Sequence, residues 1–596
     1  MNRKTVKGGE FIIKETLCQD VFIPEEFSEE QKMMRDTIKD FIDKEVIPHR
    51  ERFEKKDYAL TEETMRKVGD LGLLSVSVPE EYGGMEAGFV STMLVCDYIS
   101  GANGSLGTAF GAHTGIGTMP IVLYGTEEQK KKYLPKLASG EWFGAYCLTE
   151  PDAGSDANSG RTKAVLSEDG KYYKITGQKM WISNAGFANL FIVFARIEDD
   201  KNITGFILER DETNGLSFGE EEHKLGIRSS STRQVFFNET KIPVENILGE
   251  RNGGFKIAMN TLNIGRIKLA VACLEAQRKI LTNAINYANE RIQFKVPISS
   301  FGAIQKKIAD RATEIYVTES GLYRAAKNIE DKIADLKAQG LSHNEAELKG
   351  IEEFAIECSI LKVYASDTAQ QTADDGIQIY GGLGFSEDTP MEAAWRDSRI
   401  ARIYEGTNEI NTLVAIGMLI KKAMKGELEL IGPAMAVGKE LTSIPSFEIP
   451  DYSVLFSEEK DILGKLKKVF LMLSGAALQK YGMEINDHQH LLLNASDILI
   501  RIYVAESAIL RAEKLAGGNE ENAKIPVAMA KLNLFKATEF IKSKATESII
   551  SFAEGDEQRM LLSGVKRFTK YTNSPNVIKL STTIAKHFIE KNEYSL

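Results

Sequence analysis

Apolar residues recur at helical spacing over residues 27–144, after an irregular leader at 1–26. Within this block, Ser28 and Thr126 are each followed by Gln three positions later. In such a capping box the hydroxyl and the amide satisfy open N–H groups where a helix begins. Residues 27–144 are therefore predicted to form a helical domain punctuated by glycine turns.

The pattern changes between residues 145 and 253, where short apolar runs alternate with turn residues. The runs at 172–176, 190–195 and 234–237 are rich in aromatic and β-branched residues, and the first ends at Gly177. Such residues fit a pleated, half-buried surface. A small antiparallel β domain is predicted.

Long amphipathic segments return at 254–427, among them 352–371, which Gly381 and Gly382 close later. Prolines interrupt residues 428–451, which we interpret as a linker. A last helical block is predicted at 452–596, giving the order helical, β, helical and added helical.

Size and charge narrow the possible functions. A chain of 596 residues is too long for one core, so three to four domains are expected. Apolar residues make up 43% and charged residues 27%, as in ordinary globular proteins. The net charge of −11 argues against nonspecific nucleic-acid binding and against a polybasic membrane anchor.

The cysteines and the N-terminal residues point to a reducing compartment. No Cys-x-x-Cys pair is present, so no zinc framework is predicted, and His488 and His490 are too close in sequence to share a helical face. The start of the chain lacks the apolar stretch of a signal peptide, and no apolar run reaches about 18 residues. A cytoplasmic location and no metal are expected.

One carboxylate is a candidate for chemistry. Glu405 lies between Tyr404 and Gly406, after apolar residues and arginines. Shielding from water would raise its pKa and make it a usable base. A Glu-Gly pair can equally well end a helix, so this segment alone does not decide.

Three other segments have the composition of a ligand site, each with a plain alternative. Residues 146–156 are small and hydroxylic, which suits close backbone approach to a ligand or a simple turn. In 177–185, Trp181 could cover an aromatic cofactor while Ser183 donates a hydrogen bond, or Trp181 could be a core residue. The Gly-rich 376–385 is no Rossmann fingerprint and could be a helix C-cap with a loop.

Taken together, these motifs closely resemble the acyl-CoA dehydrogenase family of flavoproteins, over about residues 27–427. Residues after about 427 look like the extension of the very-long-chain branch. Gly302 stands where shorter-chain relatives usually have Gln, so one flavin contact is expected to be missing or replaced. Six motifs match in the family's order: 146–156, 177–184, 222–228, 262–266, 381–385 and 404–410.

The resemblance implies a mainly α fold with a central β domain. Its parts would be an N-terminal helical domain, a β-barrel-like middle domain and a four-helix bundle, plus an extra C-terminal helical domain. It also implies FAD-dependent α,β-dehydrogenation of a long-chain acyl-CoA to trans-2-enoyl-CoA in fatty-acid β-oxidation. Electrons would pass to an electron-transfer flavoprotein.

The resemblance assigns roles to individual residues. Glu405 matches the family's α-proton base, with hydride passing to flavin N5. One branch places its base just before the arginine of 262–266, but here Gly265 occupies that position. Glu405 is therefore the remaining candidate, and Glu409 is interpreted as a bundle or flavin-edge residue.

The other expected contacts fall into three sets, and the family's flavin lies across a subunit contact, so a homo-oligomer is expected, with a dimer favoured. The set expected at the flavin ring and ribityl chain is Tyr146, Leu148, Thr149, Gly154, Ser155, Trp181, Ser183, Thr407 and Glu409. The set expected at the adenine and pyrophosphate is Arg291, Phe294, Gln378, Gly381 and Gly382. The set expected at the substrate is Ser155, Asn263, Arg266 and Gly406.

Two other functions stay open at this point. The same superfamily includes oxidases that pass electrons to oxygen, and an assembly factor could keep the fold without catalysis. In the extension, residues 505–513 have helical spacing and could pack on their own subunit, join two subunits or touch a membrane. The acidic net charge favours packing, so membrane contact is not expected.

Overall fold

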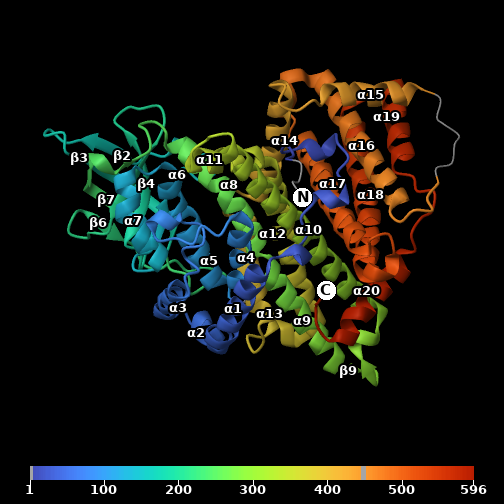
Figure 1. Ribbon diagram of the computed structural model, residues 1–596, viewed down its shortest axis with the longest axis horizontal. Helices are drawn as coiled ribbons and strands as arrows, with labels where there is room; N and C mark the ends of the chain where they lie inside the picture. The colour runs from blue at the N-terminus through green and yellow to red at the C-terminus, as the bar shows by residue number, and fades with distance from the viewer. Residues whose placement is uncertain (1–4, 102, 444–450) are drawn as a thin grey trace.

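A computed structural model describes residues 5–101, 103–443 and 451–596 (Figure 1). The β domain lies at one end of the molecule and the C-terminal helices at the other, with the helical bundle between them (Figure 1). Both predicted capping boxes are confirmed, at Ser28 before α1 and at Thr126 before α7. The first domain contains α1 (Glu29–Glu45), α2 (Arg50–Glu54), α3 (Tyr58–Asp70), α4 (Phe89–Ser100), α5 (Gly104–Gly111), α6 (Met119–Tyr124) and α7 (Glu127–Ser139).

The middle domain is one sheet around its own apolar core. Its strand order is β6-β7-β3-β2-β4-β5-β8, and β1 also pairs with β4. The predicted strands at 190–195 and 234–237 are confirmed within β4 and β7. The strands are β1 (Gly144–Cys147), β2 (Lys163–Leu166), β3 (Tyr172–Ser183), β4 (Leu190–Ile197), β5 (Thr204–Glu209), β6 (Leu216–Phe218), β7 (Thr232–Pro243) and β8 (Ile247–Leu248).

Two expectations about this sheet are wrong. It is not purely antiparallel, because β1 and β2 each pair with β4 in parallel. The strand expected to end at Gly177 continues to Ser183, because β7 pairs along its whole length with register shifts near Gly177 and between Lys179 and Ile182. A Cβ at Gly177 would lie 2.6 Å from the Oγ1 atom of Thr162, so the missing side chain lets the strand pass.

The bundle domain follows, and α9 is extended by a small hairpin of β9 (Ile292–Gln293) and β10 (Val296–Pro297). The helix predicted over 352–371 is two helices that meet at Phe354, and the second ends at Gly381 with φ +63°. The helices are α8 (Gly254–Ala272), α9 (Leu274–Glu290), α10 (Gly302–Ala338), α11 (His343–Glu353), α12 (Ala355–Tyr380), α13 (Met391–Arg399) and α14 (Asn408–Met424).

One helical stretch meets the length and hydropathy of a membrane span, contrary to the expectation from sequence. It is Gly254–Glu290, which comprises α8 and α9. Within its most apolar window 78% of the residues are buried inside the protein. These helices therefore form core rather than an exposed apolar rod.

The last domain packs on the bundle. Residues 505–513 lie in α17, where 505–512 are buried and Glu513 is half-buried. The Tyr316 hydroxyl of α10 donates to the Ala508 carbonyl at 3.4 Å. The predicted linker at 428–451 contains a helix, α15, while residues 444–450 lie outside the described residues. The helices are α15 (Ile431–Thr442), α16 (Ser457–Tyr481), α17 (Gln489–Ala516), α18 (Lys524–Phe552), α19 (Gly555–Phe568) and α20 (Val577–Lys591).

The leader fastens the C-terminal domain to the rest of the chain. It consists of short 3₁₀ turns along α17, and residues 1–4 lie outside the described part (Figure 1). Lys514 donates to the carbonyl of Val21 at 2.8 Å, and Lys467 donates to that of Lys14 at 2.8 Å.

A buried ion network joins the leader, α4, α9, α10 and α17. Arg511, 3% exposed, pairs with Glu25 at 2.8 Å and with Glu319 at 2.6 Å. Glu319 also accepts from Arg278, which pairs with Asp97 at 3.0 Å. Glu25 is exposed, but the other members lie in a poorly solvated interior, so removing one of them leaves its buried partners incompletely compensated.

We expect Arg511→Met to lower the free energy of unfolding by about 3 kcal/mol, because Glu319 then keeps one cation fewer in a buried position. Urea titration followed by fluorescence would measure this. The matched control is Arg559→Ala, whose pairing with Asp556 at 2.7 Å is fully exposed and should contribute below about 1 kcal/mol. Equal losses in the two variants would contradict a special role for the network.

Candidate functional site

Glu405 lies in a strained turn between the 3₁₀ turn Ile400–Arg402 and α14. Its φ is +58° and that of Gly406 is +79°, a region that non-glycine residues rarely adopt. The Asn411 amide donates to the carbonyls of Glu405, Gly406 and Thr407 at 3.1, 2.8 and 3.2 Å. Lys362 of α12 adds a hydrogen bond to the Gly406 carbonyl at 2.7 Å. The surroundings thus hold a conformation that the chain alone would disfavour.

The carboxyl group of Glu405 is shielded from water. Its Oε2 atom is inaccessible and has no hydrogen-bond partner among the described residues. Burial raises the pKa of Glu405 to about 7, although the nearby Arg266 and Lys362 cations oppose that rise. A carboxyl group that titrates near neutral pH can take and release a proton under physiological conditions.

Gly265 of α8 provides the space for this carboxyl. A Cβ at Gly265 would lie 2.3 Å from Oε2 of Glu405. Gly265 occupies the position from which one branch of the resembled family supplies its base, so that position lies beside Glu405 in space. Arg266, 5% exposed, donates to Asn263 at 2.7 Å beneath the carboxyl, so the structure places this pair deep in the bundle rather than at the surface.

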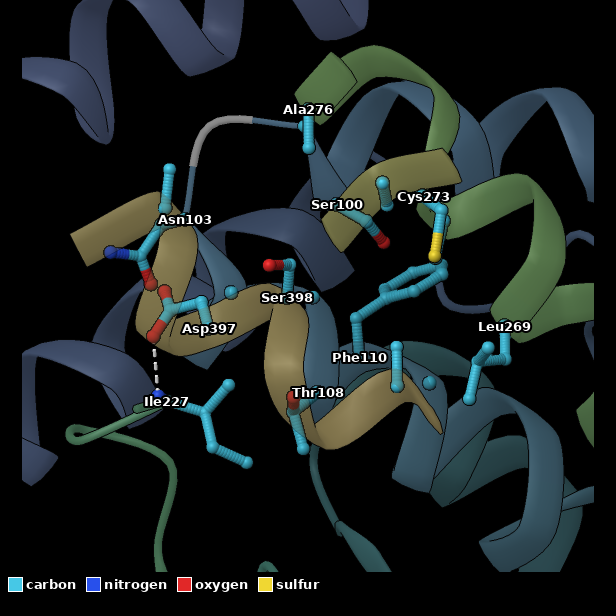
Figure 2. A pocket seen from close by; sticks show the side chains of 18 of the residues that line it. Ser100, Asn103, Thr108, Phe110, Ile227, Leu269, Cys273, Ala276, Asp397 and Ser398 are labelled. Carbon is cyan, nitrogen blue, oxygen red and sulfur yellow. Dashed lines mark hydrogen bonds between the residues drawn. The ribbon is translucent and has the colours of Figure 1, made fainter. Parts of the chain in front are cut away.

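A cavity of about 440 Å³ opens beside Glu405. Glu405, Tyr404 and Ser183 line it, as do Val46 and Arg50 of the first domain. Its walls include Phe110, Leu269 and Cys273 (Figure 2). A largely apolar cavity with several polar groups on its wall suits a ligand with a long apolar part.

Asp397 is a further carboxyl on the cavity wall. It accepts a hydrogen bond from the backbone N–H of Ile227, so it joins α13 to the loop after β6 (Figure 2). Burial raises the pKa of Asp397 to about 7. Its hydrogen bond between two elements indicates a positioning role.

The flavin-ring residues of the sequence prediction come together at the end of β1 and in β3. The Lys179 ammonium, 2% exposed, pairs with Glu150 at 2.6 Å and donates to the Leu148 carbonyl at 3.1 Å. The N–H of Met180 donates to the Thr149 carbonyl at 3.0 Å. These contacts thus join the residues after β1 to β3, which lie about 30 residues apart in sequence.

Two side chains of the predicted flavin-ring set, Tyr146 and Trp181, are available to a ligand. The Tyr146 hydroxyl is buried and has no hydrogen-bond partner among the described residues. Trp181 is 54% exposed in a bulge of β3, with φ +61°, so the alternative of a core Trp is wrong. Gly154 and Ser155 lie in an exposed bend after β1.

The adenine-end residues lie elsewhere. Stacking of Tyr380 on Tyr287, with ring centroids 4.2 Å apart, joins the end of α12 to that of α9. A Cβ at Gly381 or Gly382 would meet nothing within 4 Å. The β9 hairpin lies far from the β domain (Figure 1). None of the residues in the adenine-end set lines the cavity beside Glu405; the set is Arg291, Phe294, Gln378, Gly381 and Gly382.

The residues after Glu405 have different surroundings. Thr407 caps α14 by accepting from the N–H of Ile410 at 3.3 Å. Glu409 is exposed, and hydrogen bonds at the helix start lower its pKa. Glu409 is therefore no second buried base.

Sequence reasoning missed Lys362 and Asn411, the side chains that hold the Glu405 turn. Lys362 is 0% exposed and Asn411 is 0% exposed. A lysine inside the apolar stretch 355–366 is a signal that could have identified the first, since an unpaired buried charge is rare. Asn411 carries no comparable signal.

Comparison with known proteins assigns the family. Residues 28–141, 145–240 and 252–418 match the N-terminal, middle and C-terminal domains of acyl-CoA dehydrogenases, and 465–567 match a further C-terminal domain. A probable acyl-CoA dehydrogenase from Bacillus subtilis (strain 168) is 43% identical over 591 residues, which cover 99% of this chain and 98% of that protein. The chain belongs to the acyl-CoA dehydrogenase family.

Two further relatives match most or all of this acyl-CoA dehydrogenase family member. The human mitochondrial very long-chain specific acyl-CoA dehydrogenase is 35% identical over 484 residues, 76% of this chain and 70% of that protein. The crystal structure of an acyl-CoA dehydrogenase complexed with FAD from Bacillus anthracis is 42% identical, with a TM-score of 0.95 over 99% of this chain and 100% of that one. The predicted family and fold class, including the extra C-terminal helices, are confirmed.

Glu405→Gln should change how stability depends on pH. In wild type the folded protein holds a proton on Glu405 between its ordinary pKa of 4.5 and about 7, whereas the unfolded chain does not. The contribution of Glu405 to the free energy of unfolding is therefore most favourable below pH 4.5 and is lost as pH rises from 4.5 to about 7. The variant should therefore gain about 2–3 kcal/mol relative to wild type between pH 5 and pH 8, measured by urea unfolding. Glu409→Gln should lack this gain, and parallel curves for Glu405→Gln and wild type would contradict the raised pKa.

Proposed function

We propose that the protein is an FAD-dependent acyl-CoA dehydrogenase that forms trans-2-enoyl-CoA from a long-chain acyl-CoA. The observation that carries this proposal is a shielded carboxyl of pKa about 7 on the wall of a largely apolar cavity. Membership of the family supports the same reaction.

The residues fit a flavin. The partnerless Tyr146 hydroxyl, the exposed ring of Trp181 and the open space at Gly381 are what a large aromatic and phosphorylated group requires. FAD, when bound, would accept the hydride that leaves the β-carbon of the acyl chain. Tyr146, Leu148, Thr149, Trp181 and Ser183 would hold its ring end.

Glu405 would remove the α-proton. The α C–H bond breaks, its electron pair forms the new double bond, and the proton moves to the Glu405 carboxylate. A thioester α-proton is too weakly acidic unless the carbonyl oxygen is polarised in the transition state. The backbone N–H of Glu405 makes no hydrogen bond within the described residues and is our candidate donor, fixed by the Asn411 and Lys362 contacts.

A glycine face on α5 supports a long acyl chain. Gly104, Gly107 and Gly111 all line the cavity at helical spacing. A Cβ at Gly111 would meet nothing within 4 Å, so the absence of a side chain at Gly111 keeps the cavity open, whereas Gly104 and Gly107 let Asp397 and Ser100 approach α5 closely. Val46 and Arg50 line the same cavity.

We also propose a homodimer in the cytoplasm that passes electrons to an electron-transfer flavoprotein. Phe294, 88% exposed, and Phe385, 85% exposed, support a subunit contact at the adenine-end residues. Steady peroxide formation without another acceptor would instead identify an oxidase. Glu405 and its supporting contacts argue against a non-catalytic assembly factor.

Glu405→Gln should keep bound yellow flavin but slow its anaerobic reduction by acyl-CoA at least 100-fold, as expected for loss of a general base. Stopped-flow absorbance would measure the rate. The control is Glu357→Gln, which alters another buried carboxyl whose pKa burial raises, where it accepts from the N–H of Gly9 at 2.7 Å. Near-normal reduction by Glu405→Gln would overturn the assignment.

Gly111→Leu should shift the preference toward shorter acyl chains, because the new side chain would occupy the cavity. We expect kcat/KM for long acyl-CoAs to fall at least tenfold, about 1.4 kcal/mol, while that for short ones changes little. A chain-length series would test this. Gly464→Leu is the control, since its Cβ space is equally open and lies in α16. A uniform loss at every chain length would contradict the role of the glycine face.

A further inference from the structure

Lys362 is a buried cation with neutral partners. Its side chain is fully buried in α12, and its ammonium group donates to the Gly406 carbonyl at 2.7 Å and to Asn408 Oδ1 at 2.8 Å. It forms no ion pair within the described residues. Asp367, an acid on the same helix, pairs instead with Arg402 at 2.6 Å. A lysine with so little compensation has a high cost of burial, which suggests a function.

The partners of Lys362 form the frame of the Glu405 turn. Asn408 begins α14 and also donates to Ser366 Oγ at 3.0 Å and to Asp367 Oδ1 at 2.9 Å. The Gly406 carbonyl that Lys362 holds is shared with the Asn411 amide at 2.8 Å. Lys362 therefore fixes the Gly406–Thr407 peptide, one residue beyond Glu405, from a helix 44 positions earlier in sequence.

We propose that Lys362 is a positioning residue for the dehydrogenation: its ammonium group holds the Gly406 carbonyl next to Glu405 and supplies the positive charge that favours the ionised carboxylate of Glu405. This inference rests on the proposed function. Charge and hydrogen bonding are combined in one group, so a substitution that removes only one of them can separate the two effects.

Other charged and titratable groups face the same space. Arg266 of α8 acts on both Glu405 and Lys362, and Cys273 at the start of α9 faces Lys362. Tyr146 of β1 and Tyr404 face Glu405. Burial lowers the pKa of Lys362 to about 8, so it remains largely charged where Glu405 titrates, near pH 7.

The test compares three variants of the flavin-bound protein. Lys362→Arg keeps the charge, Lys362→Gln keeps an amide donor without charge, and Lys362→Met keeps neither. Without the cation the carboxylate is less favoured, so the pKa of Glu405 rises and the acidic limb of the flavin-reduction rate moves to higher pH. We expect a shift of about one pH unit in Lys362→Gln and Lys362→Met, with Lys362→Arg close to wild type. Lys362→Met should also lose maximal rate, because the turn is released.

A second readout does not depend on turnover. Infrared difference spectra between pH values, with Glu405→Gln as the blank, follow the carboxyl band of Glu405 itself. Lys422→Gln is the matched control, since Lys422 is a buried lysine of α14 that contacts the Gly8 and Glu353 carbonyls instead. If Lys362→Met does not fold, the pair Lys362→Gln and Lys362→Arg still decides.

An unchanged Glu405 titration in Lys362→Gln would overturn the proposal, as would an equal shift in Lys422→Gln. If no acyl-CoA reduces the flavin of wild type, the proposed function fails, but the infrared titration still reports whether Lys362 governs Glu405. The two failures are thus distinguishable.

Discussion

The ionisation of one carboxyl group depends on a balance between burial and charge. Removal from water favours the neutral form of Glu405, while Arg266 and Lys362 favour the carboxylate. A carboxyl left in water would be too weak a base, and one buried without cations would stay protonated at neutral pH. The result, a pKa of about 7, needs both effects at once.

The backbone that carries this carboxyl is unfavourable by itself. A non-glycine residue at φ +58° costs roughly 1–3 kcal/mol, and it persists only where the surroundings fix it. Contacts from α12 and α14 do so, and these helices keep their relation because the bundle core around them is closely packed. The ion network through Arg278 and Arg511 links that bundle to the leader and to α17, so distant parts of the chain support the geometry of the turn.

The features that sequence predicted well are local or belong to motifs. Capping at Ser28 and Thr126 depends on residues three positions apart, and the apolar run of β4 is buried on both faces. Pairing between distant segments explains the errors, since β7 extends β3 beyond Gly177. Glu405 was found through its motif, but the Lys362 contact spans 44 positions and has no motif of its own.

The arrangement of the two cofactor-binding sets constrains the proposed assembly. Ring-end residues lie by the β domain, whereas Arg291 and Phe294 lie on the β9 hairpin beyond α9 (Figure 1). A two-fold axis would bring the second set of one protomer to the first set of its partner and, by symmetry, complete both sites at once. The same contact would cover the exposed ring of Phe294, which has no evident role on a free surface. In such a dimer, cofactor binding and association become linked equilibria, so each would strengthen the other.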